Sequence, residues 1–147
     1  MSKKHIFLSY CRENAAKVSL LRDALIQAGE PVWWDQDILP GQDWQLEIKK
    51  AMKEAYAVVS CLSLETQQRF QSGVYPELRD AIKQLRQMDA GSMFLYPVRL
   101  SQCELPKLEI DDTRSFSDLQ YLDIFGPDKA QAIQKLVAAL QQATLRP

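Results

Sequence analysis

Five polar residues that could take part in chemistry fall where predicted strands or helices begin or end. Ser9 and Tyr10 end the first predicted strand, Arg12 follows it, and Asp35 ends the second strand. In an open parallel sheet such positions meet at the carboxyl edge, where ligands bind. Glu77 is the second residue of a later predicted helix, and helix N-termini favour an ionised carboxylate. An ionised carboxylate can stabilise positive charge in a transition state, and an arginine can bind a phosphate.

These residues also have ordinary structural explanations. An acid in a first helical turn commonly does no more than complement the helix dipole, which would account for Glu77. Arg12 would serve equally well as a solvated loop residue. For Asp35 we favour hydrogen bonding within its own loop over contact with a ligand.

The segment from Val32 to Trp44 contains all three tryptophans of the chain. Its pattern predicts a short buried strand, then a loop built on Pro40-Gly41, then a helix capped by Asp43. Trp44 opens that helix at the spacing of core residues, so we predict a structural role for its side chain.

Apolar runs rich in strand formers predict five strands, at His5–Tyr10, Pro31–Trp34, Tyr56–Leu62, Met93–Leu100 and Leu119–Phe125. Helices are predicted at 14–29, 43–55 and 76–88, and again after Gly126-Pro127. Strands that alternate with helices predict a parallel sheet covered by helices on both faces. We therefore expect an α/β, flavodoxin-like fold with a five-stranded parallel sheet, in a single domain spanning residues 1–147.

Three segments are expected to depart from regular elements. Residues 65–75 are polar and are predicted to be irregular, and residues 101–117 are predicted to be mostly loop. Pro97 lies inside the fourth predicted strand, which indicates an edge strand or a bulge, because proline cannot donate to the ladder.

Composition excludes several classes of function. The chain has 147 residues, with 18 basic and 19 acidic side chains, so nothing in its charge recruits nucleic acid or an anionic membrane. No apolar run approaches the roughly 20 residues of a membrane span, and no signal-like segment precedes His5. Cys11, Cys61 and Cys103 are widely spaced, which predicts free thiols in a reducing cytoplasm. With His5 as the single histidine, no metal site is expected.

Three blocks of sequence, in order, resemble the Toll/interleukin-1 receptor (TIR) domain family, in particular its bacterial members. Phe7–Tyr10 (FLSY) resembles the first-strand motif, and Val32–Asp35 followed by Leu39–Gly41 resembles the second strand and its loop. Val58–Ser63 resembles the third strand, and the helix bearing Glu77 follows at the expected distance. The resemblance covers residues 4–142 and therefore nearly the whole chain.

The resemblance implies cleavage of NAD between ribose and nicotinamide, which many bacterial, plant and some animal members catalyse. Glu77 matches the catalytic glutamate, which would stabilise an oxocarbenium-like transition state. NAD would be the substrate, and no cofactor is expected. The substrate-binding residues implied are Ser9, Tyr10, Arg12, Trp33, Asp35 and Tyr75.

Three of these positions carry more specific expectations. Trp33 matches an aromatic residue that stacks on the nicotinamide side of the substrate, although a strand tryptophan is as often buried in the core. Arg12 would pair with a phosphate of NAD. Many family enzymes carry a tryptophan four residues before the glutamate. This chain has Gly73 there, and Tyr75 would supply the stacking surface instead.

The loop after the second strand is expected to mediate assembly. In assemblies of the family the corresponding loop docks onto a neighbouring TIR domain and often completes its active site, so catalysis depends on assembly. The loop here comprises Asp37, Ile38, Leu39, Pro40 and Gly41. Exposed Ile38 and Leu39 would suit that contact, unless they fold back onto the domain. The resemblance further implies a sensor domain or partner protein, and a role in bacterial antiphage defence or cell-death signalling.

Other functions fit this fold to different degrees. The main alternative is a non-enzymatic module that signals through TIR–TIR contacts. An enzyme like the nucleoside deoxyribosyltransferases, which also use a glutamate at such an edge, would cleave nucleosides instead of NAD. A phosphoacceptor receiver domain needs adjacent acids after the first strand and an aspartate ending the third. The chain has Ser9-Tyr10 and Leu62-Ser63 at those places, so this function is excluded.

Overall fold

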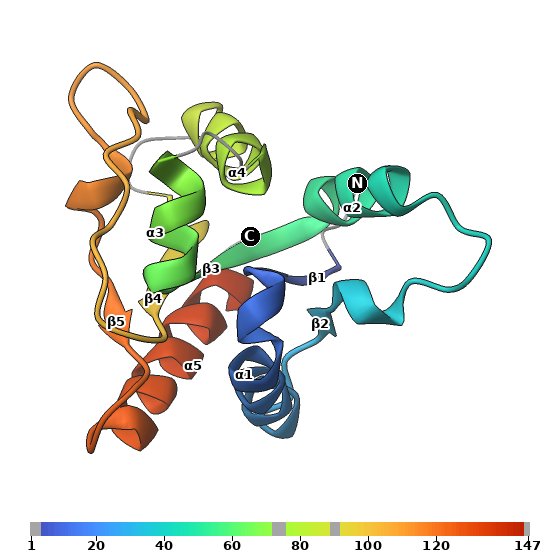
Figure 1. Cartoon of the computed structure of the whole chain (residues 1–147), viewed down its shortest axis with the longest axis horizontal. Helices are drawn as coiled ribbons and strands as arrows, with labels where there is room; N and C mark the ends of the chain where they lie inside the picture. Colours follow the sequence, from blue (N-terminus) through green and yellow to red (C-terminus); the bar gives the residue numbers. More distant parts are fainter. Residues whose placement is uncertain (1–3, 72–75, 89–91, 146–147) are drawn as a thin grey trace.

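The computed structural model describes residues 4–71, 76–88 and 92–145. Its parallel strands form one sheet of five in the order β2-β1-β3-β4-β5 (Figure 1). They are β1 (His5–Ser9), β2 (Val32–Trp33), β3 (Ala55–Leu62), β4 (Leu95–Arg99) and β5 (Leu122–Asp123). The predicted α/β fold is confirmed, and this strand order is the flavodoxin-like one. The fifth strand is shorter than the predicted Leu119–Phe125.

Helices cover both faces of the sheet, as predicted. They are α1 (Ala15–Gln27), α2 (Trp44–Lys53), α3 (Leu64–Gln71), α4 (Pro76–Arg86) and α5 (Lys129–Leu145), with short 3-10 turns η1 (Arg12–Asn14), η2 (Asp35–Asp37) and η3 (Phe116–Asp118). Helices α1 and α5 pack on one face, and α2 and α4 on the other (Figure 1). Within the described residues, no helix is both long and apolar enough to cross a membrane.

Strand β3 lies at the centre of the sheet and contributes to both cores. Val58 and Leu62 pack with α2 and α4, whereas Val59 and Cys61 pack with α1 and α5. Successive side chains of a strand point to opposite faces, so a strand covered on both sides must be apolar throughout. Each fully buried aliphatic side chain of this kind stabilises the fold by roughly 1.5–3 kcal/mol.

The prediction that residues 65–75 are irregular is wrong for the part that the structure describes. Residues 64–71 form α3, directly after β3. Ser63 explains the start of this helix, because its Oγ accepts a hydrogen bond from the backbone N–H of Thr66 (3.2 Å). A serine that binds the third amide in this way is an N-cap.

The prediction of an edge strand or a bulge at Pro97 is also wrong. Strand β4 lies between β3 and β5, and its register with β3 is unbroken. The oxygen of Phe94 accepts from Val58 on β3, and the oxygen of Arg99 accepts from Ile124 beside β5. Strand residues alternate in direction, so Pro97 faces the β5 side. Strand β5 pairs only with Val98 and Arg99, and the missing N–H of Pro97 therefore costs no ladder bond.

Arg99 joins the last two strands at their carboxyl ends. Its guanidinium donates to both carboxylate oxygens of Asp123 (2.5 and 2.7 Å) and to the carbonyl oxygen of Cys103 (2.9 Å). The ring of Tyr121 lies 4.8 Å from the guanidinium carbon. The side chain of Arg99 is 10% exposed and that of Asp123 is 40% exposed, so solvent screens this pair only in part.

Arg99→Met is expected to lower the free energy of unfolding by about 2 kcal/mol, because it leaves a partly buried carboxylate and a carbonyl without their donor. The hydrogen bond from Arg99 lowers the pKa of Asp123. A carboxyl whose pKa falls on folding stabilises the protein above its unfolded pKa of about 4 and loses that effect as the pH drops through the folded value. Urea unfolding should therefore show a smaller difference between the two proteins in acid than at pH 7. Lys4→Met, which breaks the exposed ion pair with Glu54, should cost much less; equal costs for the two variants would contradict this account.

Candidate active site

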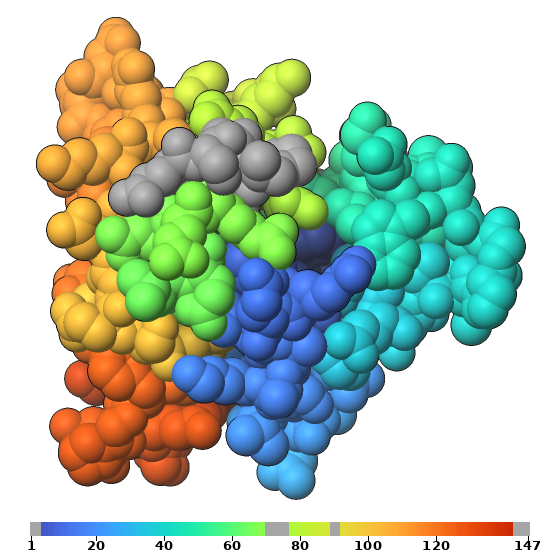
Figure 2. All heavy atoms as spheres, viewed as in Figure 1, coloured from blue at the N-terminus to red at the C-terminus, as the bar shows by residue number. Residues whose placement is uncertain are grey.

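A pocket of about 450 Å³ lies at the carboxyl ends of β1 and β2. Its lining comes from five successive parts of the chain: Tyr10, Arg12, Asp35, Gln36, Trp44, Ile48, Arg69 and Glu77. In Figure 2 it is the hollow at the centre of the face, between the blue, yellow-green and teal segments. A smaller inner cavity of about 30 Å³ shares Tyr10, Asp35, Ile48 and Glu77 and adds Phe7, Leu8 and Ser9 of β1. The two hollows together reach from the surface down to the buried end of β1.

Each polar residue of the pocket stands at the end of a regular element. Ser9 is the last residue of β1 and is buried. Asp35 begins η2, which is separated from β2 by Trp34 alone. Glu77 lies in the first turn of α4, where the helix dipole favours its ionised form. The sheet therefore assembles groups that are far apart in sequence at one edge, as the sequence predicted.

Tyr10 and Asp35 are joined by a short hydrogen bond. The hydroxyl of Tyr10 donates to Oδ1 of Asp35 (2.5 Å). Burial, together with the bond to Asp35, raises the pKa of Tyr10, so the hydroxyl remains a donor at neutral pH. The bond holds the carboxylate of Asp35 in place across the pocket. The bond shown for this carboxylate is therefore to Tyr10, beyond the end of β1, and not within its own loop as we favoured from the sequence. Asp35 also lines the pocket.

Charge differs between the inner and outer parts of the site, although Asp35 and Glu77 line both. The described residues that line the inner cavity include two carboxylates, Asp35 and Glu77, and no cationic side chain. The outer pocket adds the guanidinium groups of Arg12 and Arg69. A ligand with a cationic end and an anionic remainder would therefore be oriented with its cation inward.

Trp33 and Trp44 differ from the sequence expectations in which of them lines the pocket. Trp33 stacks on Phe7, with ring centroids 5.2 Å apart and planes at 11°, and it is not among the residues that line either cavity. Phe7 and Trp33 are register partners on adjacent strands, so both rings face the core layer below α2 and α4. Trp44, predicted to be structural, is 46% exposed and lines the outer pocket. That prediction is wrong, and Trp44 supplies the aromatic surface instead.

The predicted assembly loop projects from the domain between η2 and α2 (Figure 1). Leu39 is 65% exposed, whereas Ile38 is only partly so. Gln42 braces the loop: its side-chain oxygen accepts from the N–H of Leu39 (2.7 Å), and its own N–H donates to the oxygen of Leu39 (3.1 Å). Gly41 has φ +91°, a conformation that favours glycine. The loop therefore presents Leu39 on a defined backbone.

The profile of the TIR domain family matches residues 6–137, which is most of the chain. The chain belongs to the TIR domain family. No match was found among curated proteins.

Solved structures with the same fold include TIR domains from animals. The TIR domain of the Toll-related receptor TRR-2 from Hydra magnipapillata is 15% identical over 95% of this chain and 97% of its own, with a TM-score of 0.67. A metazoan TIR-STING receptor from C. gigas, solved in complex with 2',3'-cGAMP, is 19% identical over 92% of this chain, with a TM-score of 0.67. This chain spans 40% of that receptor. A prokaryotic SEFIR domain is 14% identical over 97% of this chain and 96% of its own, with a TM-score of 0.59.

Four residues of this TIR domain's outer pocket were missed by sequence reasoning: Trp44 and Ile48 of α2, Arg69 and Gln36. Arg69 was missed because it lies on α3, a helix that the sequence analysis did not predict. The sequence signal for that helix was Ser63, its N-cap. Gln36 directly follows Asp35 and carried no signal of its own. Tyr75, expected near the substrate, lies outside the described residues, as does Gly73, where the family's tryptophan is absent.

Cys11 lies between two pocket residues but is 3% exposed. Burial raises the pKa of its thiol to about 11, so it is protonated at neutral pH and a poor nucleophile. Cys61 and Cys103 are buried as well, and all three are free. Iodoacetamide should therefore label the folded protein slowly and the urea-unfolded protein at all three cysteines. Rapid alkylation of Cys11 in the folded state, measured by mass spectrometry, would contradict this placement.

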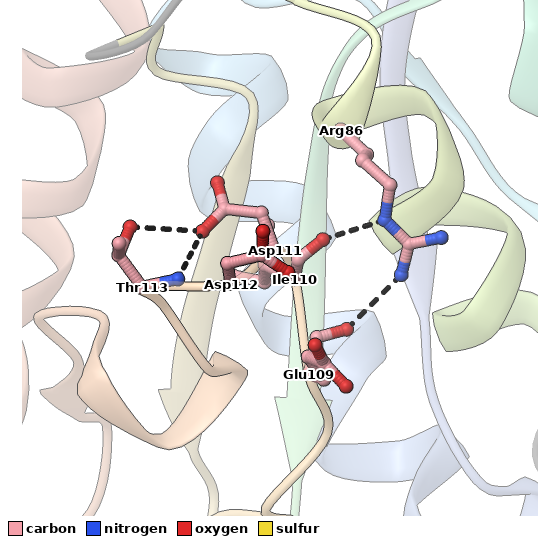
Figure 3. A pocket seen from close by; sticks show the side chains of 6 residues that line it. All are labelled: Arg86, Glu109, Ile110, Asp111, Asp112 and Thr113. Carbon is pink, nitrogen blue, oxygen red and sulfur yellow. Dashed lines mark hydrogen bonds between the residues drawn. The ribbon is translucent and has the colours of Figure 1, made fainter.

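A second pocket, of about 520 Å³, lies beside the other end of α4 (Figure 3). Arg86 donates there to the backbone oxygens of Ile110 (2.5 Å) and Glu109 (3.2 Å). Asp111 accepts from Thr113 within the same loop, and its bonds to Arg114 and Thr113 lower its pKa to about 2. These groups hold the loop against α4, so the chemistry is better sought at the pocket of Glu77.

Proposed function

We propose that this TIR domain cleaves the bond between ribose and nicotinamide in NAD, releasing nicotinamide and leaving ADP-ribose or its cyclic form. The observation that carries the proposal is the separation of charge in the site. NAD has a cationic pyridinium at one end of a ribose and an anionic diphosphate at the other. Asp35 and Glu77, which line both hollows, suit the first, and Arg12, which lines only the outer pocket, suits the second.

In this reaction the C–N bond to ribose breaks and its electron pair stays on the nicotinamide nitrogen. Nicotinamide therefore leaves as a neutral molecule, and positive charge develops on the ribose. The carboxylate of Glu77 stabilises that oxocarbenium-like charge. Water then adds to the same carbon and loses a proton, which gives ADP-ribose. Attack by a nitrogen of the adenine ring in place of water would give the cyclic product.

Other pocket residues would position the substrate. Asp35, held by the hydroxyl of Tyr10, can accept a hydrogen bond from a ribose hydroxyl. Trp44 offers an exposed aromatic face, which attracts a pyridinium or stacks on a base. Ser9 lines the inner cavity at the end of β1. These roles replace the stacking expected of Trp33.

Separate observations bear on the two alternative functions, a nucleoside-cleaving enzyme and a non-enzymatic scaffold. A nucleoside-cleaving enzyme has no anionic group to hold, so the guanidinium groups at the pocket favour a substrate that carries phosphate. A scaffold that acts by TIR–TIR contact is favoured by Leu39, exposed on its braced loop. That contact is compatible with catalysis, because assembly would complete the site. In the cell we place the domain in the cytoplasm, under a sensor domain or partner protein, in bacterial defence or cell-death signalling.

The test is NAD consumption by the purified protein over a wide range of protein concentration, with the products separated by chromatography. We expect nicotinamide and one adenine-containing product, whose retention distinguishes linear from cyclic ADP-ribose. Activity should rise more steeply than protein concentration if assembly completes the site. A protein that stays inactive even when crowded into assemblies would refute the proposal and leave the scaffold function.

A further inference from the structure

We infer that Arg69 is a second phosphate-binding residue of the site and makes it select substrates with a diphosphate over nucleosides. The inference rests on the proposed function, since it names what the outer pocket recognises. It starts from α3, the helix that brings Arg69 to a pocket otherwise lined by Tyr10 and by residues of η1, η2, α2 and α4.

The position of Arg69 is fixed by contacts at both ends of α3. At the start of the helix, Ser63 donates its hydroxyl hydrogen bond to Asn14 of η1 (2.6 Å), and Asn14 donates to Glu65 (3.3 Å). Asn14 is 4% exposed, so this link is buried. Near the end of the helix, Arg69 forms an ion pair with Glu13 of η1 (2.8 Å).

These contacts place Arg69 and Arg12 beside the same opening, because Glu13 directly follows Arg12 in η1. Both guanidinium groups line the outer pocket. A guanidinium presents its donors in a planar fork that matches two phosphate oxygens. A diphosphate carries one negative charge on each phosphate, so two neighbouring guanidinium groups match it better than one. A nucleoside has no group for either of them.

One structural role for Arg69 would be to hold α3 through Glu13. The ion pair joins side chains that are 43% and 49% exposed, and exposed pairs of this kind contribute little to stability. If the guanidinium matters only through this ion pair, removal of Glu13 should have the same effect as removal of Arg69. If the guanidinium binds substrate, removal of Glu13 leaves the pocket with its full positive charge.

The experiment compares NAD with nicotinamide riboside, which has the same bond to be cleaved and no phosphate, in Arg69→Gln, Arg69→Lys and Glu13→Gln. Arg79→Gln is the matched control, because Arg79 is exposed on α4 and lines neither cavity. We expect Arg69→Gln to lower kcat/KM for NAD about tenfold, mainly through KM, and to leave nicotinamide riboside unchanged. Arg69→Lys should fall between, and Glu13→Gln and Arg79→Gln should resemble the parent protein.

Equal losses with both substrates, no loss with either, or the same loss in Glu13→Gln would overturn the inference. Binding of ADP-ribose, measured by calorimetry, decides it independently of catalysis. If the parent protein cleaves neither substrate, the proposed function fails. Weaker ADP-ribose binding in Arg69→Gln alone would then still support the phosphate site, and unchanged or undetectable binding would refute it.

Discussion

Glu77→Gln is expected to lower the rate of NAD cleavage by about 10³-fold, with KM little changed. The substitution keeps the size of the side chain and removes the negative charge that stabilises the developing oxocarbenium ion. Since the positive charge on the ribose develops only in the transition state, the loss should appear in kcat. Single-turnover release of nicotinamide at saturating NAD measures it.

Glu47→Gln is the matched control for this variant. Glu47 is also a carboxylate in the first turn of a helix, α2, and it lines neither hollow of the candidate site. Loss of the interaction with a helix dipole costs about 0.3–1 kcal/mol of stability in either case. The two variants should therefore unfold at similar urea concentrations and differ in activity. If both keep full activity, Glu77 serves only its helix, and the catalytic role proposed for it is wrong.

The sequence predicted the architecture of the sheet because its signals are local. The apolar runs of β1 and β3 can be recognised without tertiary information, since strands covered on both faces must be apolar throughout. Once the strands are parallel, their carboxyl ends meet at one edge. The convergence of Ser9, Arg12, Asp35 and Glu77 on adjoining hollows follows from that rule and from the resemblance together.

The details that the sequence missed depend on contacts across the sheet. Which of Trp33 and Trp44 faces the pocket depends on the register of β2 against β1, which places Trp33 against Phe7. The position of Pro97 is tolerated because β5 is short, which the sequence of β4 does not encode. Helix α3 could have been predicted from the sequence, since Ser63 followed by helix-forming residues is a local signal for the start of a helix.

Leu39→Asp is expected to raise the protein concentration needed for half-maximal NAD cleavage by about 30-fold, while leaving the free energy of unfolding almost unchanged. The side chain is 65% exposed in the isolated domain, so a polar substitute costs the fold little. An exposed leucine on a braced loop would be buried in an assembly, and a charge at such a contact costs about 2 kcal/mol, or roughly 30-fold. Activity as a function of concentration, with light scattering on the same samples, measures both effects.

Leu20→Asp is the control, because Leu20 is 59% exposed and belongs to α1 and not to the loop. It should leave the concentration dependence unchanged, and a similar shift in both variants would indicate a general effect of surface charge. Mixing two variants, at a concentration at which neither is active alone, separates assembly from a direct role of the loop in its own site. In a mixture of Leu39→Asp and Glu77→Gln, a normal loop from one protomer can meet a normal Glu77 in the next. If active sites are completed between protomers, the mixture regains part of the lost activity; if each site is self-contained, it stays as inactive as its components.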